Sequence, residues 1–310
     1  MTSIFQQRLF NDFIDSSGVL APFRFSVSRS AEEVGIIQGF IQQEGGKLKR
    51  FLSRRAIING GPWLAEDIRS EELELLLKKC VDGLKGRAIY IETRNYGDYS
   101  KWRRYFEETG FVYEPHYDFV LDTASIESVD QQVHKSRKRD ISLSLRNGAT
   151  IVDNPCEEDI ISFYSILEKL YKEKVKTPLF PLSFFLKLHQ QPFCQFILVR
   201  LNEDVVGGTV LVYDQEAAYE WFACGKDGEF KNVYPSTLAT YYGIRWAAER
   251  GCRRFDMMGA GAPGDGGYGV RDFKAKFGGL LVEYGRFKYI CNKPLYRLGT
   301  LGVKLLKRFK

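Results

Sequence analysis

Strand-like and helix-like patterns alternate along most of this chain, and the alternation restricts the fold more than any other feature. In the first part, short stretches with the apolar and β-branched content of strands occur at residues 23–29, 54–60, 87–94 and 114–122. From about residue 130 the alternation starts again. It includes a basic helix over 133–148, a helix over 270–279 and one final strand over 280–290. This order predicts an α/β protein.

The two parts of the chain share a spacing. Predicted helices end at Gly83 and Gly110 in the first part and at Gly251 and Gly278 in the second, 27 residues apart in both cases (110 − 83 and 278 − 251). The repetition suggests two copies of one α/β unit. Chance is the alternative, because a helix, a glycine and a strand follow one another in many α/β proteins.

Charge and cysteine content exclude some classes of protein. The net charge of +6 lies in the segment 293–310, which has six Lys or Arg residues and no acidic residue, so the remainder is balanced. This segment is either a basic amphipathic helix on an anionic membrane surface or a terminal helix docked on the protein. Six cysteines without a C-x-x-C pair and three separated histidines predict neither a metal site nor a disulfide framework, and no cofactor is expected. Without a signal pattern or a long apolar run, a cytoplasmic location is expected.

A glycine-rich stretch begins at Gly259 and ends in the helical pattern 270–279. Its first glycines fit G-x-G-x-x-G, but a dinucleotide site needs a helix that begins inside the motif. Here the loop continues to about Val270, which disfavours that site. The simpler interpretation is a mobile loop after a buried strand, lining a pocket together with Asp256. Lysines in the following helix suit capture of a phosphate or a developing oxyanion, and a solvated basic face is the alternative.

Five segments together resemble the FemA/FemB/FemX group of peptidoglycan-bridge aminoacyltransferases: 60–63, 135–151, 234–251, 255–261 and 270–279. The resemblance implies an α/β fold of two tandem domains like Gcn5-related N-acetyltransferases, with mixed sheets flanked by helices. We expect these domains at 1–130 and 131–287, with the tail 288–310 packing back on the first. A heptad hairpin is absent, so the chain resembles the compact type without a coiled-coil arm.

The resemblance also implies a reaction. Family members move an aminoacyl group from aminoacyl-tRNA to an amine of a nucleotide- or lipid-linked cell-envelope precursor. An aminoacyl ester is already activated, so the reaction needs positioning and oxyanion stabilisation but no covalent enzyme intermediate. Acyl-CoA is disfavoured as the donor, because residues 229–242 lack the R/Q-x-x-G-x-G/A pattern. An acyl-CoA-dependent N-acyltransferase for an envelope sugar and a non-catalytic binding protein remain as alternatives.

The candidate site residues follow from these segments. As catalytic residues we expect Lys274, Lys276 and Asp256. As substrate-binding residues we expect Lys135, Arg137, Arg139, Tyr96, Asp98, Tyr219, Trp221, Tyr234, Gly261, Tyr268 and Arg271. The alternatives are a solvated face for the basic helix, core packing for Tyr219 and Trp221, a turn for Tyr96 and Asp98, and bonds to backbone amides for Asp256.

Overall fold

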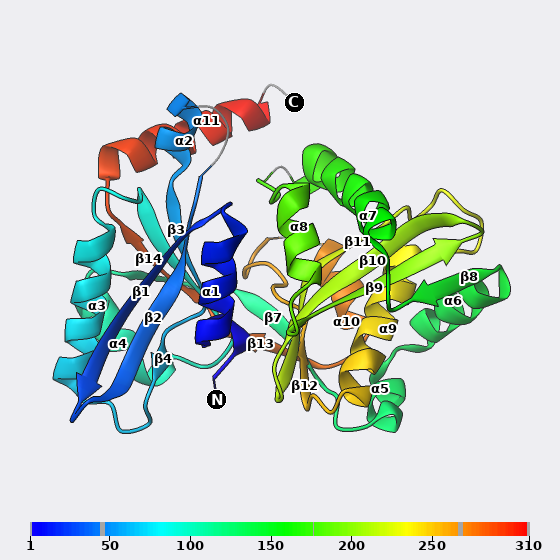
Figure 1. The fold of residues 1–310 in the computed structure, drawn as a ribbon, viewed down its shortest axis with the longest axis horizontal. Helices are drawn as coiled ribbons and strands as arrows, with labels where there is room; N and C mark the ends of the chain where they lie inside the picture. The colour runs from blue at the N-terminus through cyan, green and yellow to red at the C-terminus, as the bar shows by residue number, and fades with distance from the viewer. Residues whose placement is uncertain (1, 44–46, 176, 266–268, 309–310) are drawn as a thin grey trace. The chain divides into compact units, whose positions relative to one another are not determined.

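The computed structural model describes residues 2–43, 47–175, 177–265 and 269–308. The chain forms two compact units. Unit 1 comprises Met1–Pro115 and Tyr284–Lys310, and unit 2 comprises His116–Glu283. Each unit contains one seven-stranded sheet over the described residues, with helices packed on both faces (Figure 1). The predicted α/β class is therefore confirmed.

The strands of unit 1 are β1 (Ala21–Arg29), β2 (Glu32–Gln42), β3 (Arg55–Gly60), β4 (Trp63–Leu64), β5 (Tyr90–Asn95), β6 (Val112–Glu114) and β14 (Arg286–Ile290). Its helices are η1 (Ile4–Gln6), α1 (Arg8–Ser17), α2 (Lys47–Ser53), α3 (Ser70–Leu84), η2 (Ser100–Trp102), α4 (Arg103–Glu108) and α11 (Lys293–Arg308). The main sheet runs in the order β1-β2-β3-β5-β14-β6, and only β3 and β5 are parallel. Helices α3 and α4 close the core of unit 1 over one face, with Leu76 and Phe106 fully buried.

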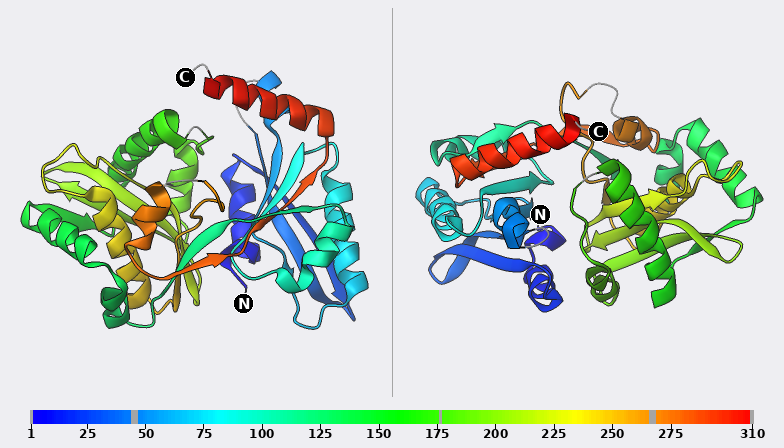
Figure 2. Two further views of the ribbon diagram at one scale, coloured as in Figure 1. Left: turned by 180° about the vertical axis from the view of Figure 1, so that it is seen from behind. Right: turned by 90° about the horizontal axis from the view of Figure 1, so that it is seen from above.

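The strands of unit 2 are β7 (Tyr117–Asp122), β8 (Ala149–Val152), β9 (Cys194–Leu201), β10 (Asp204–Tyr213), β11 (Ala217–Gly225), β12 (Arg254–Asp256) and β13 (Leu280–Glu283). Its helices are α5 (Ile126–Gln132), α6 (Lys135–Arg146), α7 (Glu157–Leu170), η3 (Tyr171–Val175), α8 (Leu182–His189), α9 (Pro235–Glu249) and α10 (Gly269–Ala275). The sheet runs β13-β7-β12-β11-β10-β9-β8. Helices α7 and α9 lie on opposite faces of this sheet (Figure 2). Two neighbouring residues of β10 face them: a Cβ on Gly208 would meet Phe163 of α7, whereas Thr209 lies against Gly243 of α9.

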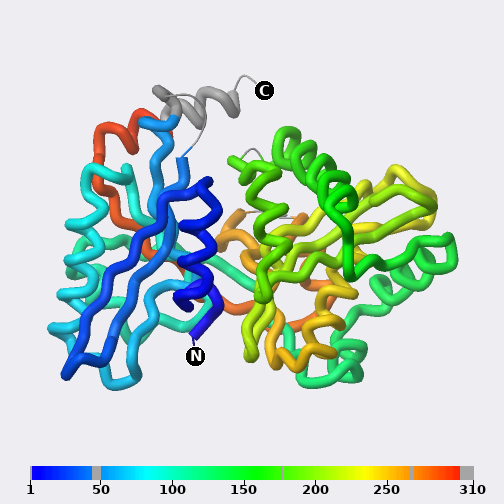
Figure 3. Tube along the Cα trace, viewed as in Figure 1, coloured from blue at the N-terminus to red at the C-terminus, as the bar shows by residue number. Residues whose placement is uncertain are grey.

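The predicted single strands 114–122 and 280–290 are wrong, because each is two strands in different sheets. Pro115 separates β6 from β7, and Gly285, at φ +64°, separates β13 from β14. A proline cannot donate a ladder hydrogen bond, and glycine allows the left-handed turn, so both strands break at these residues. Strand β7 joins the sheet of unit 2, and β14 returns to the sheet of unit 1 (Figure 3). The units consequently divide at Pro115 and Glu283 rather than at the expected residues 130 and 287.

The repeated spacing corresponds to a repeated order of elements. In unit 1 the order is α3, β5, α4, β6, and in unit 2 it is α9, β12, α10, β13. In each sheet the two strands of this series do not pair with each other, because a strand from a distant part of the chain lies between them. This strand is β14 between β5 and β6, and β7 between β12 and β13. One detail differs from expectation, because Gly83 lies inside α3, which ends at Leu84.

Candidate functional site

The loop that follows β12 in unit 2 is held in place by two side chains of α10. Lys274 Nζ donates hydrogen bonds to the backbone oxygens of Met257 and Gly259, the latter at 2.7 Å. Arg271 donates from Nε to Ala260 O at 2.8 Å and from Nη2 to Ala262 O at 2.7 Å. Residues 271 and 274 are three apart on a helix, so both side chains project from the same side. The described part of the glycine-rich loop is therefore clamped, contrary to the expected mobile connection.

The amide groups of this loop are also bound by the protein. Met258 N donates to Asp256 Oδ1, and Gly259 N donates to Asp118 Oδ1, both at 2.9 Å. Ala260 N donates to the backbone oxygen of Tyr117 at 2.7 Å. A phosphate-binding loop needs amides that point at the ligand, and these three amides already have acceptors. The geometry therefore agrees with the sequence analysis in disfavouring a dinucleotide site.

A pair of buried carboxyl groups lies beneath the loop. Asp256 is fully buried and Asp118 is 4% exposed. Burial raises the pKa of Asp256 well above its usual value, and the nearby Asp118 carboxylate raises it further. Arg254 Nη2, at 3.1 Å from Asp256 Oδ2, opposes this shift in part. The raised pKa favours the protonated form of Asp256 beside Asp118.

Glu220 of β11 is a further buried acid in unit 2. It is 6% exposed and accepts hydrogen bonds from Thr209 Oγ1 at 3.2 Å and Thr240 Oγ1 at 2.8 Å. Burial raises the pKa of Glu220, while attraction to the Lys274 ammonium group lowers it in part. Lys274 is thus an internal cation with two carbonyl partners and a buried acid nearby.

The structure separates the two predicted catalytic lysines. Lys274 is 9% exposed, whereas Lys276 is exposed to solvent. The backbone oxygen of Lys276 accepts a hydrogen bond from His134 N at 2.9 Å, which ties α10 to the start of α6. Only Lys276 therefore presents its charged group to an external ligand.

The basic helix α6 likewise divides into a bound and an exposed part. Arg137 donates to Thr237 Oγ1 at 3.0 Å and lies over the Phe273 ring at 4.5 Å, which joins α6 to α9 and α10. Burial lowers the pKa of Arg137. Lys135 and Arg139 are exposed, so both of these predicted residues could meet a phosphate.

The predicted aromatic and glycine residues of unit 2 lie in several places. Tyr219 is 3% exposed, with the Arg254 guanidinium 5.8 Å from its ring centroid. Trp221 packs edge-on against Phe180 and Phe184. Tyr234 precedes α9 and donates from its backbone N to Ser144 Oγ at 2.9 Å. Gly261, at φ +82°, accepts a backbone hydrogen bond from Tyr117 N at 2.7 Å. The remaining candidate, Tyr268, lies outside the described residues.

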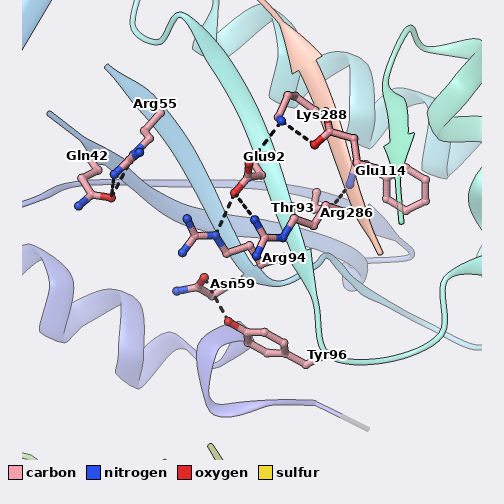
Figure 4. Close-up of polar contacts among 11 residues, drawn as sticks. Gln42, Arg55, Asn59, Glu92, Thr93, Arg94, Tyr96, Glu114, Arg286 and Lys288 are labelled. Carbon is pink, nitrogen blue, oxygen red and sulfur yellow. Dashed lines mark hydrogen bonds and ion pairs between the residues drawn. The ribbon is translucent and has the colours of Figure 1, made fainter. Parts of the chain in front are cut away.

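In unit 1 the two predicted residues have different surroundings. Asp98 is exposed and accepts a hydrogen bond from Ser100 N at 2.8 Å, as in an Asx turn. Tyr96 is 9% exposed and donates to Asn59 Oδ1 at 3.3 Å. Close to Tyr96, a group of charged side chains covers one face of β5 and β14 (Figure 4). This group was not predicted from the sequence, although the alternation at 92–94 and 286–288 is a usable signal once the strands are paired.

The helix starts that would face an acyl-CoA pyrophosphate carry carboxylates instead. In unit 2, Pro235 is the first residue of α9, and Asp227 Oδ1 accepts the hydrogen bond of Ser236 N at 3.2 Å. In unit 1, Glu72 Oε2 accepts from Arg69 N at 2.9 Å at the start of α3. A carboxylate at a helix N-terminus repels a pyrophosphate. It also accepts the hydrogen bond of a backbone amide that would otherwise bind the pyrophosphate. Neither helix start has the chemistry of an acyl-CoA site.

Among the described residues, no group of His, Cys, Asp and Glu side chains has the arrangement of a metal site. Over the same residues, every helix is too short or too polar to span a bilayer.

Two units with the same order of elements lie in one chain. Residues 189–304 match the FemAB family model, which confirms the resemblance. The structure is similar to a crystal structure of FemX (TM-score 0.70, 16% identity, 95% of this chain and 94% of that one). A search of the curated proteins by sequence gave no match.

Two further solved structures share the fold. One is the C-terminal domain of a provisionally assigned lysylphosphatidylglycerol synthetase from Agrobacterium fabrum (TM-score 0.63, 15% identity, 98% of this chain and 94% of that one). The other is a tandem acetyltransferase-like protein from the clavulanic acid biosynthesis pathway (TM-score 0.52, 10% identity, 88% and 84%). At these identities the comparisons establish the tandem fold.

Proposed function

We propose that this protein is an aminoacyltransferase that moves an aminoacyl group from aminoacyl-tRNA to an amine of a peptidoglycan or other cell-envelope precursor. The main support is the FemAB match, because residues 189–304 include the clamped loop and α10. FemX, and a synthetase named for lysylphosphatidylglycerol, share the fold over nearly the whole chain. Both names fit aminoacyl transfer in envelope synthesis, and we expect a cytoplasmic location.

The site residues receive separate roles in this proposal. Lys274 and Asp256 are buried and bonded to the loop, so they act as positioning residues that fix residues 257–259. Exposed Lys276, with Lys135 and Arg139 of α6, is suited to bind phosphate groups of the donor or the acceptor. A fixed loop costs no reorganisation during the reaction, which is how a preorganised site lowers a barrier.

The acyl-CoA alternative is the less favoured one, since Asp227 and Glu72 occupy the relevant helix starts. A non-catalytic binding protein would keep the fold without turnover. A donor screen separates the three functions. The purified chain is incubated with a UDP-linked pentapeptide and either a mixture of radiolabelled aminoacyl-tRNAs or radiolabelled acetyl-CoA. Label transferred from tRNA supports the proposal, whereas label transferred only from acetyl-CoA contradicts it. Binding of the peptide without transfer from any donor would indicate the non-catalytic protein.

We also propose peripheral contact with the inner face of the membrane through α11. Its segment 293–310 carries six cations, and Leu298 is 56% exposed. Tyr296, in contrast, packs on Tyr90 at 5.6 Å between ring centroids, so the start of the helix is also docked on unit 1. Flotation with phosphatidylglycerol vesicles tests this contact, which should weaken at high salt. Equal flotation of a chain truncated after residue 292 would contradict it.

A further inference from the structure

The charged group on the sheet of unit 1 has no role in the function proposed above. Strands β5 and β14 pair in antiparallel register, with Arg94 opposite Arg286 and Glu92 opposite Lys288. Side chains alternate between the faces of a sheet. Thr93 and Phe287 therefore turn into the core, where they are nearly fully buried, while the four charged residues share the other face (Figure 4).

The charges on this face do not balance. Glu92 Oε1 lies 2.9 Å from Arg94 Nε and 3.5 Å from Arg286 Nη1, and its Oε2 lies 3.8 Å from Lys288 Nζ. Lys288 also bonds Glu114 at 2.6 Å, so three cations share two carboxylates. Burial tends to raise the pKa of Glu92, but the cations hold it at about 2, and it is a charged member of the group. One positive charge is left over.

The excess charge is concentrated at the two arginines. Like charges directly opposite each other on paired strands are destabilising, and Arg94 faces Arg286 in this way. Burial lowers the pKa of Arg286, and the Arg94 guanidinium contributes to that lowering. Their side chains are 34% and 27% exposed, so an external anion can reach both. An anion here would offset the repulsion that the protein itself leaves in place.

Unused hydrogen-bond donors lie on the same side. Arg94 donates from Nε to Glu92, but within the part of the chain that the structure describes its two terminal nitrogens have no partner. Asn59 of β3 is paired with Arg94 in parallel register and is 4% exposed, and its Nδ2 is buried without a partner. Figure 4 shows the Asn59 amide beside the Arg94 guanidinium, with Tyr96 bonded to the amide oxygen. A buried unpartnered donor beside an unused guanidinium indicates a ligand.

We propose that Arg94, Arg286 and Asn59 form a binding site for a singly charged phosphoryl group, such as one phosphate of a diphosphate or a phosphate diester. One negative charge balances the excess. The donors come from three adjacent strands spaced by about 4.8 Å, so they approach an anion from different directions. A tetrahedral group meets such donors better than a planar carboxylate does, and guanidinium groups bind phosphate through paired hydrogen bonds. Where the phosphoryl group belongs to the acceptor precursor, the site rests on the proposed function.

Calorimetric titration of the full chain tests the site without turnover, so that it can fail separately from the transfer reaction. UDP and soluble dihexanoylphosphatidylglycerol are the probes, which distinguish a nucleotide from a lipid source, and acetate at equal ionic strength represents a carboxylate. We expect one phosphoryl probe to bind. Arg94→Gln should weaken that binding at least 10-fold, and Glu114→Gln should tighten it, because it removes a negative charge. Arg103→Gln, which breaks an exposed ion pair elsewhere in unit 1, is the matched control.

Three outcomes overturn the proposal. The first is that the wild-type chain binds neither phosphoryl probe at about 5 mM. The second is that it binds acetate more strongly than both probes. The third is that the wild type and Arg94→Gln bind the probe with equal affinity. If Arg94→Gln does not fold, Arg94→Lys keeps the charge but loses the paired geometry. It should weaken binding several-fold, and unchanged affinity in this variant contradicts the proposal equally.

Discussion

Replacement of Lys274 by methionine tests whether this lysine is an internal support of the loop. The ammonium group donates to the backbone oxygens of Met257 and Gly259 and lies near buried Glu220. Methionine fills a similar volume but leaves two carbonyls without a donor. Each buried unsatisfied group costs about 1–3 kcal/mol, and the apolar side chain recovers part of this. We therefore expect Lys274→Met to lower the free energy of unfolding by about 3 kcal/mol.

Urea unfolding followed by tryptophan fluorescence measures this change. With a slope of about 3 kcal/mol per molar urea, the midpoint should fall by roughly 1 M. Lys276→Met is the matched control, since Lys276 is exposed and only two residues away, and surface substitutions change stability by about 0.5 kcal/mol or less. Equal midpoints for the two variants would refute the internal role of Lys274.

Two further predictions concern pH. The pKa of Asp256 is raised in the folded chain, so its contribution to stability is present at acidic pH and declines as pH rises above the unfolded value of 3.8. Asp256→Asn should therefore flatten the pH dependence of the unfolding free energy above pH 3.8, and parallel curves for variant and wild type would show that the pKa of Asp256 is not raised. The contribution of Glu92 to stability has the opposite pH dependence, because its pKa is lowered from 4.5 to about 2 in the folded chain. Glu92 therefore stabilises the chain by about 3 kcal/mol above pH 4.5, and this stabilisation is lost as pH falls towards 2. Glu92→Gln should be destabilised by that amount at pH 7 and match the wild type near pH 2, and a gap that persists in acid would contradict the assignment.

The alternation of local patterns predicts the fold class, because the spacing of apolar residues indicates most strands and helices individually. It does not predict β2, whose residues Glu32 and Glu33 and glycines at 35 and 39 weaken the strand pattern. It places strands at β7 and β14 but misses that each joins a different sheet from the strand next to it in sequence. Their apolar content is ordinary, and pairing between distant segments is a tertiary property that no local propensity contains.

Only part of the candidate site could be predicted, because side-chain direction is also a tertiary property. The succession of a strand, a glycine-rich loop and a basic helix places Arg271 and Lys274 close to the loop. It does not show that both charged groups bond to the backbone oxygens of that loop. Asp118 and Glu220 were missed, because a single acidic residue within a strand pattern usually lies on a solvated face. Only the folded chain brings Asp118 beside Asp256.

The transfer of an aminoacyl group is the central claim, and the mass of the acceptor tests it most directly. A UDP-linked pentapeptide is incubated with the full chain and a complete set of charged tRNAs, and its intact mass is measured. We expect the mass to increase by one amino-acid residue, and the increase should disappear when the tRNAs are deacylated beforehand. An unchanged mass for this acceptor and for its lipid-linked form, with every tRNA still charged, would contradict the proposed function.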